Sequence, residues 1–214
     1  MQSISPTDAA AQRDSRLRIG RWLLPALLLA LTACQPSMTL MPSPIMFTKG
    51  DPRFEDNLAS RNAPEIPIFY VTNRQVLMES DTPVHTVFPG NELRLGVSHL
   101  RVGDGSMTWE ALNALSNGSD DSRRPRIYLE KMEQIAVIGE GRDTLDSPAA
   151  REFFDRINAA LAQTHNQNLL IYVHGANNAV HRATGQAAQL QHFTGRESVI
   201  LTFIWPSAER VRTY

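Results

Sequence analysis

The sequence predicts an α/β fold, with a mostly parallel sheet flanked by helices and antiparallel strands on its N-terminal side. The apolar run over residues 169–173 does not alternate with polar residues, which is typical of a strand buried on both faces of a parallel sheet. A helical pattern precedes this run, another follows it, and a second apolar run covers residues 199–204. Strands and helices in this order favour right-handed crossovers between parallel strands.

Three segments before the first helix predict the N-terminal strands. Residues 66–72 are rich in β-branched and aromatic side chains, and residues 93–100 show a weaker alternation. Residues 127–138 carry spaced aliphatic side chains that favour one or two further strands.

The first helix has a clear start. Ser147 can cap it and Pro148 suits its first turn, because proline has no backbone N–H to leave unpaired there. Phe153, Phe154 and Ile157 then fall on one face at helical spacing, so the two aromatic residues are expected in the core.

The second helix carries small residues along one face. Ala179, Ala183, Ala187 and Leu190 recur every three or four positions, which lets a helix lie close on a sheet. Gly195 is expected to end it.

The N-terminus carries a targeting signal. Four arginines precede an apolar run over residues 22–33, which is too short to span a bilayer and predicts a secretory signal peptide over residues 1–33. The run ends in Leu-Thr-Ala-Cys34, which resembles the bacterial lipobox and implies cleavage before Cys34, lipidation of its thiol and a membrane anchor. Gln35 follows, which by resemblance to Gram-negative lipoproteins implies an outer-membrane protein that faces the periplasm.

Composition limits the class of partner. The 214 residues are 42% hydrophobic with a net charge of −1, which suits one globular domain with appendages. Loss of residues 1–33, with four arginines and two aspartates, brings the net charge to about −3 and leaves no basic patch for nucleic acid. Residues 34–60 hold four prolines and no sustained periodicity, which predicts a flexible tether after the lipidated cysteine.

A tight turn follows the apolar run at residue 173. The motif His174-Gly175-x-Asn177-Asn178, followed by Phe-Ile-Trp-Pro-Ser at 203–207, resembles a family of uncharacterised bacterial α/β-hydrolases. Phe-Tyr-Val-Thr-Asn-Arg at 69–74 and Leu-Arg-Leu-Gly-Val at 93–97 are similar to the start of the same family. The resemblance implies that residues 61–214 are the N-terminal portion of a hydrolase domain, with a partial α/β-hydrolase fold.

The resemblance also implies roles within this turn. The backbone N–H of Ala176 is the first candidate for the oxyanion hole, and Asn177 is the second. His174, Gly175 and Asn178 are expected to brace the loop, because asparagine tolerates unusual dihedral angles and the catalytic histidine of this fold comes last in chain order.

The nucleophile is not identifiable in the sequence. No Gly-x-Ser-x-Gly elbow occurs, and in the resembling family Ser207 only shapes a loop. The expectation is an esterase-like serine hydrolase on a lipid anchor, truncated before nucleophile, acid and base and inactive as given. The alternative is a non-catalytic periplasmic lipoprotein that binds a partner or a small ligand. A third mechanism based on Asp143, Asp146 or His174 has only loop position in its favour.

Neither a metal nor another cofactor is expected. His165, His181 and His192 lack the spacing of a ligand set, so they are interpreted as surface histidines. Cys34 is the only cysteine, which excludes an intrachain disulfide.

Overall fold

The computed structural model describes residues 37–48, 63–77, 83–164 and 167–207. The predicted signal peptide, Cys34 and the end of the chain lie outside these residues. No helix in the described ranges is long and apolar enough to cross a bilayer.

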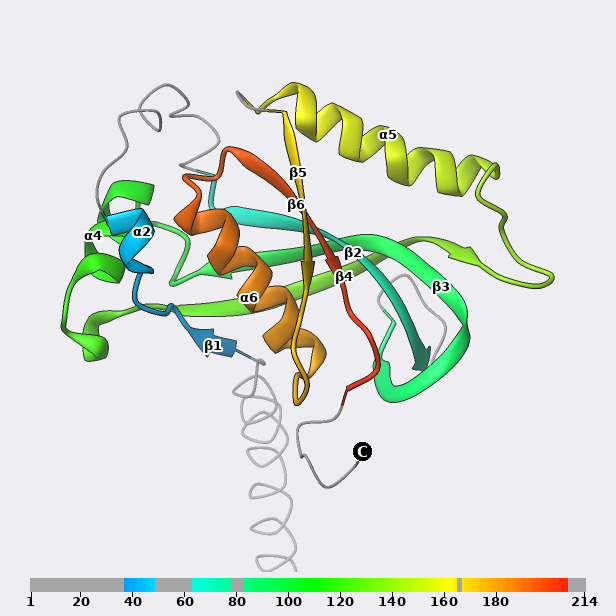
Figure 1. The fold of residues 1–214 in the computed structure, drawn as a ribbon, viewed down its shortest axis with the longest axis horizontal. Coiled ribbons are helices and arrows are strands. Elements are labelled where there is room, and N and C mark those ends of the chain that lie inside the picture. Colours follow the sequence, from blue (N-terminus) through cyan, green and yellow to red (C-terminus); the bar gives the residue numbers. More distant parts are fainter. Residues whose placement is uncertain (1–36, 49–62, 78–82, 165–166, 208–214) are drawn as a thin grey trace, which may run out of the picture. The chain divides into compact units, whose positions relative to one another are not determined.

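The described chain builds a six-stranded mixed sheet with helices on both faces (Figure 1). The elements in order are β1 (Ser37–Thr39), α2 (Ile45–Thr48), β2 (Glu65–Val76), β3 (His85–Val102), α4 (Trp109–Asn117), η2 (Asp121–Arg123), β4 (Arg126–Ile138), α5 (Pro148–Ala162), β5 (Asn168–Val173), α6 (Val180–Phe193) and β6 (Ser198–Phe203). The strand order across the sheet is β1-β4-β3-β2-β6-β5.

The sheet has an antiparallel half and a parallel half. β1, β4, β3 and β2 pair antiparallel in turn, whereas β2 pairs parallel with β6, and β6 parallel with β5. Only β2 and β3 of the antiparallel pairs are consecutive elements, since α4 and η2 separate β3 from β4 and β1 pairs with the distant β4. Helical crossovers bring β5 and β6 in later. The predicted α/β class with antiparallel N-terminal strands is confirmed. The sheet is mixed rather than mostly parallel: of the strand pairings in the described residues, three are antiparallel and two, β2 with β6 and β6 with β5, are parallel.

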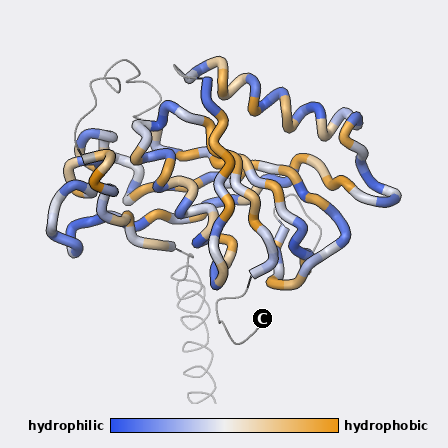
Figure 2. Tube along the Cα trace, in the orientation of Figure 1, coloured by the Kyte–Doolittle hydropathy of each residue, from blue (hydrophilic) through white to orange (hydrophobic). Residues whose placement is uncertain are grey.

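Two hydrophobic cores lie on opposite faces of this sheet. Neighbouring residues of one strand point to opposite faces, so Ile200 packs with Ala187 of α6, while Val199 packs with Phe153 of α5. Figure 2 shows hydrophobic residues concentrated on the central strands, while α5 alternates between hydrophobic and hydrophilic positions. Ser147 caps α5 through its side chain and Pro148 occupies the first turn, as predicted.

Strand β5 is not buried on both faces, so that prediction is wrong. Leu169, Ile171 and Val173 are 38%, 68% and 57% exposed, while Leu170 and Tyr172 pack toward α6. β5 lies at the edge of the sheet, and α5 contacts mainly β4 and β6 on the face that Ile171 shares. An apolar run therefore identified the strand but not its neighbours.

The predicted tether is wrong for residues 37–48. β1 pairs with β4, Leu40 is buried, and the backbone N–H of Met41 donates to Gln189 Oε1 at 2.6 Å. Met38 packs against Gly185 of α6, where a Cβ would come within 2.9 Å of the Met38 Cγ. The missing side chain at Gly185 makes this close approach possible.

Three smaller observations concern single elements, and the second of them selects one of two predicted alternatives. Phe154 is 45% exposed rather than in the core, because only Phe153 of the pair faces the sheet. Residues 126–138 form one strand, β4, with register irregularities. Helix α4, capped by Thr108, was not predicted.

Candidate functional site

The turn after β5 is anchored by His174. This side chain is buried, its ring stacks on Trp205 with centroids 5.2 Å apart, and Trp205 Nε1 donates to the His174 carbonyl at 2.8 Å. His174 Nδ1 donates to the Gly175 carbonyl at 2.7 Å. Burial lowers the pKa of His174, against the opposing hydrogen bond to Gly175, so the ring is neutral near pH 7. These contacts are those expected of a residue that stabilises the loop conformation.

Asn177 and Asn178 shape the rest of the turn. Asn177 has a φ of +66°, in the left-handed region that asparagine tolerates better than most residues. Asn178 donates from Nδ2 to the Gly175 carbonyl at 3.1 Å and from its backbone N–H to Ser207 Oγ at 3.0 Å. The buried Ser207 hydroxyl thus joins the loop after β6 to the loop after β5.

Ala176 lies at the tip of this turn. Its residue is exposed, and its backbone N–H makes no hydrogen bond with any group in the described ranges. A backbone N–H without a partner in the described residues, in an exposed residue just after the carboxyl end of a strand, can serve as an oxyanion donor. Gly175 beside it is also exposed, which leaves room for a substrate.

Arg74, at the end of β2, holds the two loops together. It is only 2% exposed, and its guanidinium donates to four backbone carbonyls: Trp205 at 3.2 Å, Thr86 at 3.1 Å, Asn178 at 2.9 Å and Ser207 at 3.1 Å. Sequence reasoning assigned Arg74 no role. Its only signal was its place at the end of the Phe-Tyr-Val-Thr-Asn-Arg segment.

The other candidates take structural positions. Asp143 Oδ2 accepts from the Val137 backbone N–H at 3.1 Å, at the end of β4, and Asp146 is exposed. His192 is 1% exposed, so its assignment to the surface is wrong; it packs beside Trp109 with centroids 6.1 Å apart. Burial, with a smaller contribution from Arg196, lowers the pKa of His192 to about 3.

The remaining histidines do not form a ligand set in the structure. His181 is half-buried at the start of α6, and His165 lies outside the described residues. In the ranges that the structure describes, no group of three His, Cys, Asp or Glu side chains could hold a metal ion.

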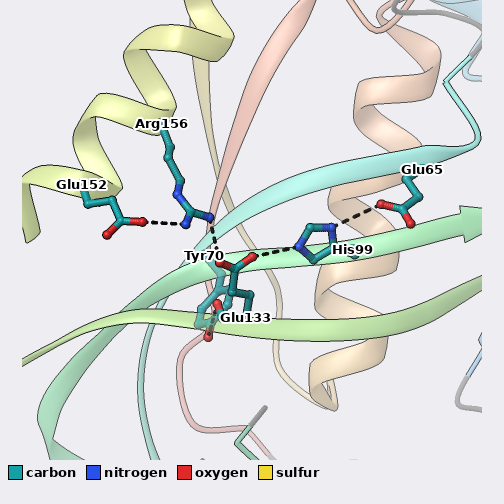
Figure 3. Close-up of polar contacts among 6 residues, drawn as sticks. All are labelled: Glu65, Tyr70, His99, Glu133, Glu152 and Arg156. Carbon is teal, nitrogen blue, oxygen red and sulfur yellow. Dashed lines mark hydrogen bonds and ion pairs between the residues drawn. The ribbon is translucent and has the colours of Figure 1, made fainter. Parts of the chain in front are cut away.

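A charged cluster on the α5 face of the sheet was also not predicted (Figure 3). Arg156 of α5 pairs with Glu133 of β4 at 2.8 Å and with Glu152 at 2.6 Å, and His99 Nε2 lies 3.3 Å from Glu133. Burial would raise the pKa of Glu133, but hydrogen bonds from Arg156 and His99 outweigh it and hold the pKa below its usual range. The Arg156–Glu133 pair joins α5 to β4. Because these pairs are partly exposed, each contributes little to the free energy of unfolding.

The C-terminal part of the chain is similar to a known protein family. Neither the curated proteins nor the solved structures contain a match to this chain. Residues 149–214 match the family model described as alpha/beta hydrolase of unknown function (DUF900). The matched segment includes most of α5, the turn at 174–178 and the Trp205-Pro206-Ser207 loop, and it is therefore similar to an α/β-hydrolase family whose function is unknown.

Proposed function

We propose that this protein is an esterase-like hydrolase of the serine type in which the turn after β5 stabilises the oxyanion formed on a carboxylic ester. The observation that carries the proposal is the N–H of the exposed residue Ala176, which has no hydrogen-bond partner among the described residues, in a turn fixed by His174, Asn178 and Arg74. The family match over residues 149–214 supports a hydrolase.

Ester hydrolysis needs a group that stabilises the oxyanion and a nucleophile that attacks the carbonyl carbon. When a nucleophile adds to an ester carbonyl, negative charge moves to the carbonyl oxygen, and a preorganised N–H lowers the energy of that state. Ser207 is a poor nucleophile, because it is buried and its hydroxyl accepts a hydrogen bond from Asn178. We assign the oxyanion donor alone, and no described residue as nucleophile, acid or base.

The test is hydrolysis of p-nitrophenyl butyrate by the full chain, compared with buffer and with heat-denatured protein. With no residue assigned as nucleophile, water is the attacking group in this test. One oxyanion donor is worth about 10²–10³ in rate, so a rate about 10²-fold above buffer is expected, far below that of a complete serine esterase. A fluorophosphonate probe in a parallel sample reports whether a serine reacts covalently. A folded protein with no turnover above buffer contradicts the proposal.

The alternative is a binding protein without catalysis. A pocket beside the first turn of α6 favours it, since ligand binding there needs no nucleophile. Ligand binding without ester turnover would select this alternative.

We also propose that the protein is a lipoprotein anchored through Cys34 in the outer membrane, facing the periplasm. The supporting features are the basic and apolar segments and the lipobox-like Leu-Thr-Ala-Cys34. Mass spectrometry of protein from a bacterial envelope should show Cys34 as an acylated N-terminus, and Cys34→Ala should release the protein from the membrane fraction. An unmodified Cys34 in the envelope-derived protein contradicts this proposal.

A further inference from the structure

Three large apolar side chains are exposed near the N-terminal end of the described chain. Met41, Ile45 and Met46 are 53%, 81% and 78% exposed and lie within six residues of one another. We call these three residues the apolar patch. Neighbouring exposed apolar groups on a folded protein mark a contact with a partner or a membrane, whereas single ones need no explanation.

The backbone that carries the patch is held in place by the rest of the fold. The Ser43 N–H donates to the Ser116 carbonyl of α4 at 2.9 Å, and the hydroxyl groups of the same two serines lie 2.9 Å apart. The Phe47 ring of α2 stacks on Phe193 at the end of α6, with centroids 6.3 Å apart. The patch therefore lies on a fixed surface formed by the segment after β1 and by α2, which lies near α4 (Figure 1), so binding would order little further chain.

The segment that carries the patch is uncharged. No Asp, Glu, Lys, Arg or His occurs over residues 35–48. The Leu40 N–H donates to the Pro125 carbonyl at 2.9 Å, and residues 120–124, just before this proline, carry two acidic and two basic side chains. Contact with a bilayer would therefore bury no charge of the segment itself and meet no net repulsion between these neighbours and anionic head groups.

The patch follows shortly after the proposed lipid anchor. Met41 is seven residues beyond Cys34, a separation that an extended chain spans in at most about 25 Å. Acyl chains on Cys34 would keep this part of the chain at a high effective concentration at the membrane surface. Even a weak contact between the patch and lipid would then be populated.

We propose that the apolar patch inserts into the head-group region of the bilayer and is a second membrane contact of this protein. The partner is a phospholipid surface, and the inference rests on the proposed anchor at Cys34. An anchor alone lets the domain rotate, whereas a second contact fixes which side of it faces the bilayer. The turn at 174–178 precedes the other end of α6, about 20 Å away along this helix of 14 residues, so the contact does not include it.

The experiment uses the acylated full chain with Pro42→Cys, purified from a bacterial envelope and reconstituted in phosphatidylethanolamine–phosphatidylglycerol vesicles. Because acylation blocks the thiol of Cys34, the introduced thiol is the only one that an environment-sensitive fluorophore can label. A lipid that carries a nitroxide near its head group quenches fluorophores that enter the membrane. We expect blue-shifted emission and nitroxide quenching at position 42, and neither for a label introduced by Glu140→Cys in the exposed turn after β4.

Two sets of substitutions test whether the patch makes the contact. Ile45→Ser combined with Met46→Ser removes most of the patch and should abolish the quenching at position 42. Leu145→Ser is the matched control, because Leu145 is 62% exposed and lies in the turn before α5, and it should leave the quenching unchanged. Melting temperatures equal to that of the wild type show that the variants are folded.

The outcomes separate this contact from the anchor. Acylated, vesicle-bound protein without quenching at position 42 would overturn the patch contact and leave the anchor intact. A blue shift without nitroxide quenching would assign the patch to a second copy of the chain or to another protein, which also overturns the proposal. An unmodified Cys34, seen by mass spectrometry of the same sample, would refute the anchor and this inference together.

Discussion

Replacing Arg74 with methionine tests how the two loops of the candidate site are held. The guanidinium donates to carbonyls in three segments: Thr86 at the start of β3, Asn178 after β5, and Trp205 and Ser207 after β6. Methionine fills similar space but donates to none of them. The bonds to Asn178 and Ser207 are fully buried, so water cannot readily replace the lost donor.

The magnitude follows from those two carbonyls. A buried acceptor left without its donor costs about 1–3 kcal/mol, so the two buried carbonyls of Asn178 and Ser207 together account for about 2–6 kcal/mol. Arg74→Met should therefore lower the free energy of unfolding by about 2–6 kcal/mol, a large part of the 5–15 kcal/mol typical of a domain. Arg74→Lys should lose roughly half as much, because lysine cannot donate as a planar fork.

Urea unfolding of the full chain is the assay, with Arg151→Met as a matched control. Arg151 is exposed on α5, so its loss should change stability by no more than about 0.5 kcal/mol. Amide exchange at Asn178, whose buried backbone N–H donates to Ser207 Oγ, should also speed up in Arg74→Met, since the turn loses its anchor. An Arg74→Met protein within about 1 kcal/mol of the wild type would refute the argument.

Three further predictions concern stability and association. His85 and His192 have folded pKa values lowered to about 4 and 3, so the unfolded chain binds more protons below pH 6.5. Stability should fall as the pH drops from 6.5, by roughly 2 kcal/mol for each histidine at pH 5, and equal urea midpoints at pH 7 and pH 5 would contradict this. Gly96→Ala should destabilise by at least about 3 kcal/mol, because a Cβ there would overlap the backbone carbonyl oxygen of Glu133 and lie 2.6 Å from the Tyr70 ring; thermal melting tests this, and an unchanged melting temperature argues against the packing. Ile171→Lys places a charge on the exposed edge strand β5 and should reduce any self-association measured by light scattering. The stability cost should stay within about 1 kcal/mol. Unchanged scattering would show that the chains do not associate through β5.

Local signals in the sequence predicted local structure well. Ser147 and Pro148 defined the start of α5 because capping and the missing proline N–H act within one turn. The apolar runs located β5 and β6, since a short apolar run bounded by turn residues favours a strand whatever its final burial. The fold class then followed from the order of these elements.

Long-range contacts were the part that the sequence could not supply. Residues 37–48 resemble a tether by their prolines, but Met38 fits against Gly185, which is 147 positions later in the chain. The apolar run in β5 cannot show that this strand lies at the edge of the sheet. His192 looks like a surface residue until α6 is placed against Trp109.

The candidate site also has a part that local sequence predicts and a part that depends on long-range contacts. The motif at 174–178 located the turn, because its glycine and asparagines have local conformational roles. The buried contact of Arg74 with four carbonyls and the pocket beside the first turn of α6 arise from segments that only folding brings together.

The most direct test of the proposed oxyanion donor compares Ala176→Pro with Ala176→Gly in hydrolysis of p-nitrophenyl butyrate. Proline removes the backbone N–H at position 176, whereas glycine keeps it and removes only a methyl group. Melting temperatures establish that both variants are folded. We predict that Ala176→Pro loses about 10²-fold in rate while Ala176→Gly stays close to the wild type. Equal rates in the two folded variants would contradict a role for this N–H in hydrolysis.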